Sequence, residues 1–193
     1  MSTTSRLFIF TFSLLFMNFS HENEEIVSTI INEFDLDQYD SNFTIVVSVK
    51  NQSLYLLRKE EIIKKFDIST SRYGVGFENE SLKTPLGLHT IKKKIGDDVP
   101  INGIFKYRNF SGAISIPDDP DFIDQDLITT RIMWLAGSDD KNKHSYDRFI
   151  YIHGTPEEFN IGKPSSHGCI RMRNSDIYAL YEIIATGTPV IIR

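Results

Sequence analysis

Cysteine is nearly absent from this sequence: Cys169 is the only one among 193 residues. No disulfide bond can therefore form within the chain, and the thiol stays free even in an oxidising compartment. A structural zinc site needs three or four ligands, and the histidines at 89, 144, 153 and 167 lack the close paired spacing of such sites. We therefore predict no bound metal and no other cofactor.

An excess of positive charge is missing as well. The 21 Lys and Arg residues are outnumbered by 26 Asp and Glu residues, which gives a formal net charge of −5. Binding to nucleic acid depends on clustered Lys and Arg, so nucleic acid is not an expected partner. With 40% hydrophobic residues, a chain of this length is typical of one ordinary domain that can bury a proper core.

Apolar runs are short, and the longest stands near the N-terminus. Residues 7–19 follow Arg6 and are too few to span a bilayer comfortably, but they have the layout of a secretory signal. Residues 18–21 lack a small-x-small cleavage pattern, and no cysteine follows that could carry a lipid. We predict that residues 1–20 are a signal peptide or a short membrane-targeting segment. The periplasm or cell envelope is then the expected location, with association of the protein with the membrane through this segment. An uncleaved anchor, a misassigned start and a cytoplasmic protein are the alternatives.

Beyond this segment, hydrophobic periodicity predicts mostly strands. Apolar residues at helical spacing predict an amphipathic helix from residue 22 to 34, and a polar connection continues to residue 42. A second helix is expected to begin at Asp176, capped by Asn174 or Ser175, and to end at Gly187. Alternating or continuous apolar runs predict strands over residues 44–49, 54–58, 62–69, 88–95, 127–135, 149–153 and 190–192.

Two long segments interrupt these strands. Residues 70–87 are predicted to be a loop, and residues 109–126 are predicted to be a solvated acidic insertion. The acidic insertion lacks the ligand order of a calcium-binding loop. His89 lies on a predicted strand, and we interpret it as structural rather than catalytic.

The chain between His153 and Arg171 carries the residues of a nucleophilic site. It reads H-G-T-P-E-E-F-N-I-G-K-P-S-S-H-G-C-I-R. A thiol is a nucleophile only as a thiolate, and a histidine within hydrogen-bond reach can take its proton at neutral pH. The strand that ends at His153, together with the turn-rich return to Cys169, can bring imidazole and thiol together. Gly168 leaves room for a carbonyl group beside the sulfur.

Simpler interpretations compete with this one. A lone cysteine is most often a small buried hydrophobic residue, and a histidine that closes a strand is most often packed rather than catalytic. The polar composition around Cys169 gives little reason for burial, so a reactive thiol is the favoured hypothesis.

The motif also carries a family resemblance. The H-G-T, the I-G and above all S-H-G-C-I-R-M-R-N resemble the signature of the YkuD-type L,D-transpeptidases, which act on bacterial peptidoglycan. The segment Lys83-Thr84-Pro85-Leu86-Gly87 and the C-terminal Gly187-Thr188-Pro189-Val190 extend the resemblance to residues 43–193. It implies a mainly β, α+β catalytic domain of two packed mixed sheets with a helix after the catalytic loop. The domain boundaries are then 1–20, 22–42 and 43–193.

The resemblance assigns roles residue by residue. It implies that Cys169 is the nucleophile, that His153 is the base and that the carbonyl of Gly154 orients the imidazole. His167, Gly168 and Cys169 are expected to supply N–H groups to an oxyanion hole. Of the remaining motif residues, Ser166 is expected to brace the loop.

Three further residues are candidate substrate contacts. Arg171 occupies a position that favours a substrate carboxylate, and a structural ion pair is its alternative. Tyr73 and Thr84 are weaker candidates, because residues of a surface loop often have no such role.

The reaction implied by the resemblance is acyl transfer between stem peptides. A tetrapeptide stem acylates Cys169, D-alanine leaves, and an amine on a neighbouring stem takes the acyl group. An L,D-carboxypeptidase, in which water takes the acyl group, remains open because motif residues do not separate the two. A non-catalytic peptidoglycan-binding module is the third possibility, and the intact His153 and Cys169 argue against it.

Export can be tested directly. A fusion of residues 1–25 to a reporter that is active only outside the cytoplasm is expected to give signal. Silence of the reporter, with full-length protein in the cytosol, would contradict export. It would favour a recycling carboxypeptidase, since free stem peptides rather than polymer are found inside the cell.

Overall fold

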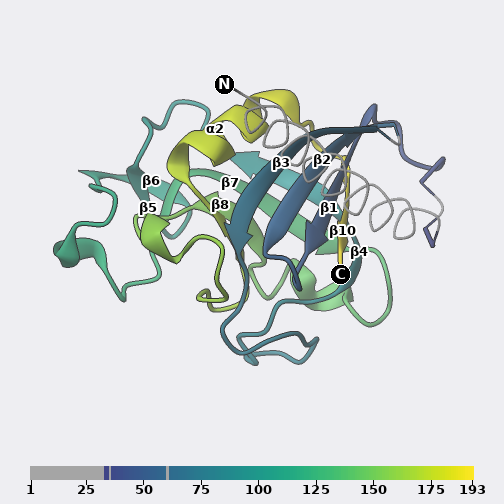
Figure 1. Ribbon diagram of the computed structural model, residues 1–193, viewed down its shortest axis with the longest axis horizontal. Helices are drawn as coiled ribbons and strands as arrows, with labels where there is room; N and C mark the ends of the chain where they lie inside the picture. The colour runs from purple at the N-terminus through teal and green to yellow at the C-terminus, as the bar shows by residue number, and fades with distance from the viewer. Residues whose placement is uncertain (1–32, 35, 60) are drawn as a thin grey trace, which may run out of the picture. The chain divides into compact units, whose positions relative to one another are not determined.

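The structure is a computed structural model that describes residues 33–34, 36–59 and 61–193 (Figure 1). The predicted signal segment and nearly all of the predicted 22–34 helix lie outside the described residues. Leu36–Arg193 form one compact unit. None of the helices in the described part is long and apolar enough to cross a membrane.

Ten strands in the described residues form a single mixed sheet. The strand order is β4-β10-β1-β2-β3-β9-β8-β7-β5-β6, and β4 also pairs with β7. The strands are β1 (Phe43–Ser48), β2 (Ser53–Arg58), β3 (Glu61–Ser69), β4 (Gly87–Ile95), β5 (Gly103–Lys106), β6 (Asn109–Ile114), β7 (Ile128–Gly137), β8 (Tyr151–Gly154), β9 (Ile170–Met172) and β10 (Pro189–Ile192). Short 3-10 turns are η1 (Pro120–Phe122), η2 (Lys143–Ser145) and η3 (Glu158–Asn160), and the α-helix in the described part is α2 (Asn174–Ile183).

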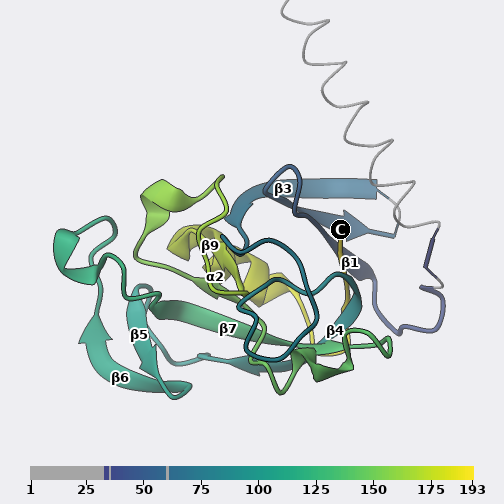
Figure 2. The same cartoon turned by 90° about the horizontal axis from the view of Figure 1, so that it is seen from below.

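The sheet closes on itself because β4, which pairs with β10, also pairs with β7 from the far part of the strand order. Seen from below, β1 and β3 lie in one layer and β4 and β7 in the other, with α2 between them (Figure 2). The predicted mainly β fold is confirmed. Its two layers belong to one continuous hydrogen-bonded sheet rather than to two separate ones.

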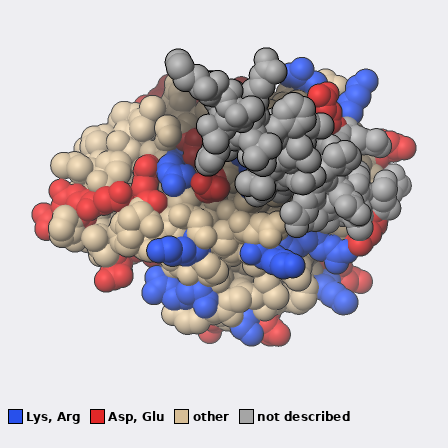
Figure 3. All heavy atoms as spheres, viewed as in Figure 1, with Lys and Arg blue, Asp and Glu red and all other residues tan. Residues whose placement is uncertain are grey.

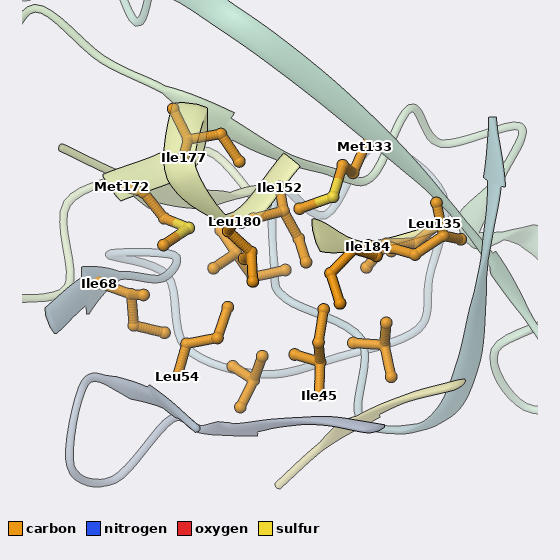
Figure 4. Close-up of a cluster of buried hydrophobic side chains, with 14 of the residues drawn as sticks. Ile45, Leu54, Ile68, Met133, Leu135, Ile152, Met172, Ile177, Leu180 and Ile184 are labelled. Carbon is orange, nitrogen blue, oxygen red and sulfur yellow. The ribbon is translucent and has the colours of Figure 1, made fainter. Parts of the chain in front are cut away.

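One apolar core joins the two layers and the helix. Ile177 and Leu180 of α2, with Ile184 just after the helix, pack against strand residues that include Leu54 and Ile152 (Figure 4). These residues are at most 1% exposed. Burial of each such side chain stabilises the fold by about 1.5–3 kcal/mol, so the core holds the start of α2 firmly behind the strand that carries His153.

Most predicted strands are present, with shifted ends. The first two predicted strands form the β1–β2 hairpin, in which Ser48 pairs with Ser53. The strand predicted from residue 149 begins at Tyr151, because Phe149 adopts a left-handed backbone with φ 57° that does not continue a strand.

Two predictions were wrong in detail. Residues 109–114 are not part of a loop but form β6, which pairs with β5 in a hairpin. All six β6 residues are exposed, so burial imposes no alternation on that stretch of sequence. Helix α2 begins at Asn174 rather than Asp176 and ends before Gly187. The Asn174 side chain does not cap the helix, because it bonds to Thr129, Thr130, Thr155 and Glu158 instead.

His89 has the structural role that the sequence predicts. It is fully buried on β4, and its ring nitrogens lie 3.0 Å from the carbonyl of Gly87 and 3.0 Å from the hydroxyl of Ser145. Burial lowers the pKa of His89 to about 4. Between pH 6.5 and 4 the unfolded chain therefore binds a proton that the folded chain does not, and folding stability falls as the pH falls through this window.

We expect His89→Gln to reduce this pH dependence. Between pH 7 and pH 4, the wild type should lose about 3 kcal/mol more of its free energy of unfolding than the variant does. Urea denaturation at pH 7, 5.5 and 4 measures the difference. The exposed His144, changed to Gln, is the matched control and should follow the wild type. Parallel curves for wild type and His89→Gln would contradict the assignment.

Candidate active site

His153 is held rigidly in the middle of the sheet. It lies on β8, opposite Ile132 of β7 and Arg171 of β9, and is 1% exposed. Its Nδ1 lies 2.7 Å from the carbonyl oxygen of Gly154. A carbonyl only accepts hydrogen bonds, so Nδ1 carries the hydrogen and Nε2 of the neutral ring is free to take a proton. This is the orienting role that the sequence predicts for Gly154.

Gly154 has no space for a side chain. A Cβ atom there would meet the Asn174 Oδ1 at 2.6 Å and the Thr129 carbonyl oxygen at 2.8 Å. The glycine therefore lets β8 pack closely against β7 and the start of α2, and this packing fixes the carbonyl that orients the imidazole.

Cys169 lies beside β8 because β8 and β9 are parallel. Ile152 pairs with Ile170, which places the preceding Cys169 next to Tyr151. The thiol donates a hydrogen bond to the Phe149 carbonyl at 3.3 Å and accepts one from the Tyr151 N–H at 3.4 Å. Cys169 is half-buried. Thiol and imidazole thus belong to neighbouring strands, although in the described contacts the thiol bonds to the β8 backbone rather than to the ring. Catalytic hydrogen bonds are often this loose before substrate binds.

The turn before Cys169 is braced from two sides. The Ser166 hydroxyl accepts the Gly168 N–H at 3.2 Å and donates to the Cys169 carbonyl at 2.6 Å. The Thr84 hydroxyl donates to the Gly168 carbonyl at 3.0 Å. Gly168 has φ 122°, which an L side chain rarely adopts. Ser166 therefore braces the loop as predicted, and Thr84 acts with it.

These bonds change two predicted roles. Thr84 is fully buried, so it supports the turn and does not contact substrate. The N–H of Gly168 is bonded to Ser166, so it is not free for an oxyanion. Among the described contacts, the N–H groups of His167 and Cys169 have no acceptor, and they are the donors available for an oxyanion hole.

Arg171 does not face the solvent. Its side chain is 0% exposed, and Nη1 lies 3.2 Å from Glu157 Oε2 and 3.3 Å from Ser165 Oγ. On its other side Nε lies 2.8 Å from Asp126 Oδ1, and Nη2 bonds to the same oxygen. The predicted contact with a substrate carboxylate is therefore wrong for this arrangement. The alternative, a structural ion pair, describes Arg171, because two internal carboxylates already occupy its planar donor groups.

His167 and Tyr73 form one wall of the site. Their rings stack with centroids 5.8 Å apart, and His167 Nδ1 lies 2.5 Å from Asp126 Oδ2. Tyr73 is 49% exposed, so it remains a candidate substrate contact. A cavity of about 350 Å³ lies beside this wall. The cavity is lined by Asn79, Glu80, Leu82, Asp147, Arg148, Phe149, Ile150 and His167.

The fold and the motif can now be compared with known proteins. The model of a family described as the L,D-transpeptidase catalytic domain, YkuD, matches residues 42–192. The chain belongs to the L,D-transpeptidase family.

Named relatives share shorter stretches. A Bacillus subtilis (strain 168) protein named "Putative L,D-transpeptidase YqjB" is 47% identical over 91 residues, which cover 47% of this chain and 44% of the relative. A protein of Escherichia coli (strain K12) named "Probable L,D-transpeptidase YbiS" is 51% identical over 43 residues, 22% of this chain and 14% of the relative. The chain thus matches less than half the length of these curated relatives.

Solved structures support the fold. An L,D-transpeptidase from Xylanimonas cellulosilytica has a TM-score of 0.52 and 14% identity, over 81% of this chain and 63% of that one. An L,D-transpeptidase from Mycobacterium tuberculosis H37Rv has a TM-score of 0.50 and 16% identity, over 79% and 57%.

The electrostatics of this L,D-transpeptidase site differ from the expected resting thiolate. Burial lowers the pKa of His153 to about 4, although the Gly154 carbonyl and the charge of Asp126 act against this shift. Burial and then Asp126 raise the pKa of the Cys169 thiol to about 12. Both shifts favour the uncharged forms of the imidazole and the thiol at neutral pH.

Three functional residues were missed by sequence reasoning. Asp126 and Glu157 hold Arg171, and Asn174 joins α2 to β7. Glu157 stands inside the recognised motif beside a second acidic residue, Glu158, and the local sequence does not indicate that it is buried. Asp126 is the last acidic residue before an apolar strand, and this position was the one available signal.

The neutral resting thiol can be measured. Because Cys169 is the only cysteine, iodoacetamide reports on it alone. We expect slow alkylation at pH 7 and a rate that rises about tenfold per pH unit up to at least pH 10, since only the thiolate reacts. The same protein in urea is the control, and its thiol should titrate near a pKa of about 8.5. A plateau of the folded protein below pH 8 would instead reveal a resting thiolate.

Proposed function

We propose that this protein is a peptidoglycan L,D-transpeptidase that carries the acyl group of a tetrapeptide stem on Cys169. The observation that carries the proposal is the parallel β8–β9 pairing, which sets a half-buried thiol beside a histidine whose tautomer the Gly154 carbonyl selects. Family membership supports the same activity.

The first half-reaction is acylation. The Cys169 proton passes to Nε2 of His153 while the sulfur forms a bond to the carbonyl carbon of the residue that precedes the terminal D-alanine. The electron pair of the carbonyl moves onto its oxygen, which the N–H groups of His167 and Cys169 stabilise. When the tetrahedral intermediate collapses, the C–N bond breaks, and His153 returns the proton to the amine of D-alanine.

The second half-reaction transfers the acyl group. An amine of a second stem attacks the thioester, the C–S bond breaks, and the thiolate recovers a proton that the attacking amine releases to His153. The cavity lined by Phe149 and His167 supports this outcome over hydrolysis, because it offers a second peptide a place beside two residues that adjoin Cys169: Phe149 accepts the hydrogen bond of the thiol, and His167 belongs to the same turn. Tyr73, exposed beside His167, is the side chain best placed to contact a peptide there.

The polymer is reached outside the cytoplasm. Export through residues 1–20 to the periplasm or cell envelope is part of the proposal, and it rests on the apolar run behind Arg6.

Product analysis tests the activity. The full-length protein, incubated with disaccharide-tetrapeptide at millimolar concentration, should yield free D-alanine and a cross-linked dimer, both detected by mass spectrometry. Cys169→Ala should abolish both products. His153→Gln should lower the rate by about 10²–10⁴-fold, as loss of a general base does.

His144→Gln is the matched control, since His144 is exposed and pairs only with a nearby Asp147 among the described contacts. Tripeptide without dimer, at every acceptor concentration, would identify a carboxypeptidase instead. Unchanged activity of Cys169→Ala would overturn the mechanism.

A further inference from the structure

Asp126 is the one residue of the acidic segment between β6 and β7 that reaches the active site in the described contacts. The segment contributes acidic side chains to the left end of the molecule (Figure 3). Of these, Asp119 caps η1 and Asp118 accepts the Phe159 N–H. Asp126 instead turns inward, and its side chain is 27% exposed. Its backbone has φ 47°, a left-handed conformation that costs energy for a residue other than glycine.

The Asp126 carboxylate joins two different parts of the site. One oxygen accepts the Nε hydrogen of Arg171 at 2.8 Å, and the other lies 2.5 Å from Nδ1 of His167. Arg171 stands opposite His153 in the sheet, and His167 begins the turn that leads to Cys169. A single side chain thus connects the strand partner of the base with the turn of the nucleophile.

The charges around Arg171 do not balance. Among the described residues, its one guanidinium faces two carboxylates, Asp126 and Glu157. Glu157 is 1% exposed, and its Oε1 has no hydrogen-bond partner in the described contacts. His167 is the other group that contacts the Asp126 carboxylate. A proton on His153 adds a positive charge beside this cluster of two carboxylates and one guanidinium.

We propose that Asp126 is a positioning residue of the reaction, which holds His167 and Arg171 and whose negative charge stabilises the imidazolium that forms at His153. This proposal rests on the proposed function. The carboxylate touches no reacting atom in this arrangement and acts through the groups that it holds.

The charge of Asp126 has opposite effects on a resting thiolate and on the tetrahedral intermediate. In the resting enzyme it opposes ionisation of Cys169, because a thiolate adds a second negative charge nearby. In the tetrahedral intermediate the sulfur is uncharged, the negative charge sits on the substrate oxygen, and His153 is cationic. Asp126 then stabilises the imidazolium, so it favours the intermediate over a free thiolate. The enzyme thereby limits reactions of its thiol until a substrate is bound.

Several ionisable groups face these residues and share in their titration. His153 is surrounded by Asp126 and Arg171, and the Tyr151 ring contacts it. Cys169 faces Asp126, Arg171 and Arg148. Asp126 itself faces Arg171, His153 and His167. Glu157 acts on them through Arg171.

The variant Asp126→Asn removes the charge and keeps the shape. Asparagine tolerates left-handed backbone and can still accept a hydrogen bond from Arg171. In the full-length protein we expect the midpoint of iodoacetamide alkylation to fall by about one pH unit, because the thiolate is no longer opposed. We expect D-alanine release from disaccharide-tetrapeptide to fall at least tenfold. Alkylation then becomes faster at a given pH while turnover becomes slower; damage to the fold would instead bring the midpoint to the value of about 8.5 expected in urea.

Two variants serve as controls. Asp124→Asn removes an exposed charge from the same segment, at a residue that also has a left-handed backbone, and should match the wild type in both readouts. Asp126→Glu restores the charge and should recover the alkylation midpoint and part of the turnover.

The outcomes separate the two proposals. If the wild type releases no D-alanine, the proposed function is overturned. Alkylation needs no substrate, so a shifted midpoint in Asp126→Asn would still support the charge role of Asp126. An alkylation rate raised equally at every pH would indicate an opened loop and overturn the charge role. So would an unchanged midpoint, whatever happens to turnover.

Discussion

The parallel pairing of β8 with β9 is the constraint on which the active site depends. Parallel strands need a long crossover, and residues 155–169 supply it. The pairing sets Cys169 beside Tyr151 and Arg171 opposite His153. Both strands are buried in the core, so the register cannot slip by one residue without turning His153 away from the site. The geometry of the nucleophile and base is therefore a consequence of core packing.

Burial of this site has a chemical consequence. Removing His153 from water makes it a weak base, and removing the Cys169 sulfur makes the thiol a weak acid. Such a pair does not exist as a resting ion pair, unlike in enzymes whose thiol is ionised before substrate arrives. Activation then has to come with substrate, through an oxyanion hole and a counter-charge that act only once the carbonyl is attacked. Asp126 fits the second of these needs, because it bonds to Arg171, which stands opposite His153 in the sheet.

The β5–β6 hairpin at the edge of the sheet and the acidic segment that follows it contribute one side chain, Asp126, to the candidate active site. β5 and β6 extend the sheet beyond β7, and the chain then returns along the segment that ends in Asp126. Arg171 is consequently occupied by an internal carboxylate, and a substrate carboxylate has no access to it. The guanidinium therefore secures the site instead of selecting the substrate. The exposed Tyr73 and the cavity lined by Phe149 and His167 are the remaining candidates for contact with a substrate.

Much of this protein could be predicted from its sequence. Local sequence patterns predicted most strands, the glycines at 154 and 168, and the candidate pair Cys169 and His153. Such patterns suffice because residue chemistry, turn geometry and apolar alternation depend on residues that are close in the chain. Strand β6 escaped prediction because none of its side chains is buried. The bond of Arg171 to Asp126 and that of Thr84 to Gly168 escaped prediction because the partners lie 45 and 84 residues apart in the chain. The protonation state of the site was decided by the tertiary structure alone, because desolvation depends on everything that surrounds a group and not on its sequence neighbours.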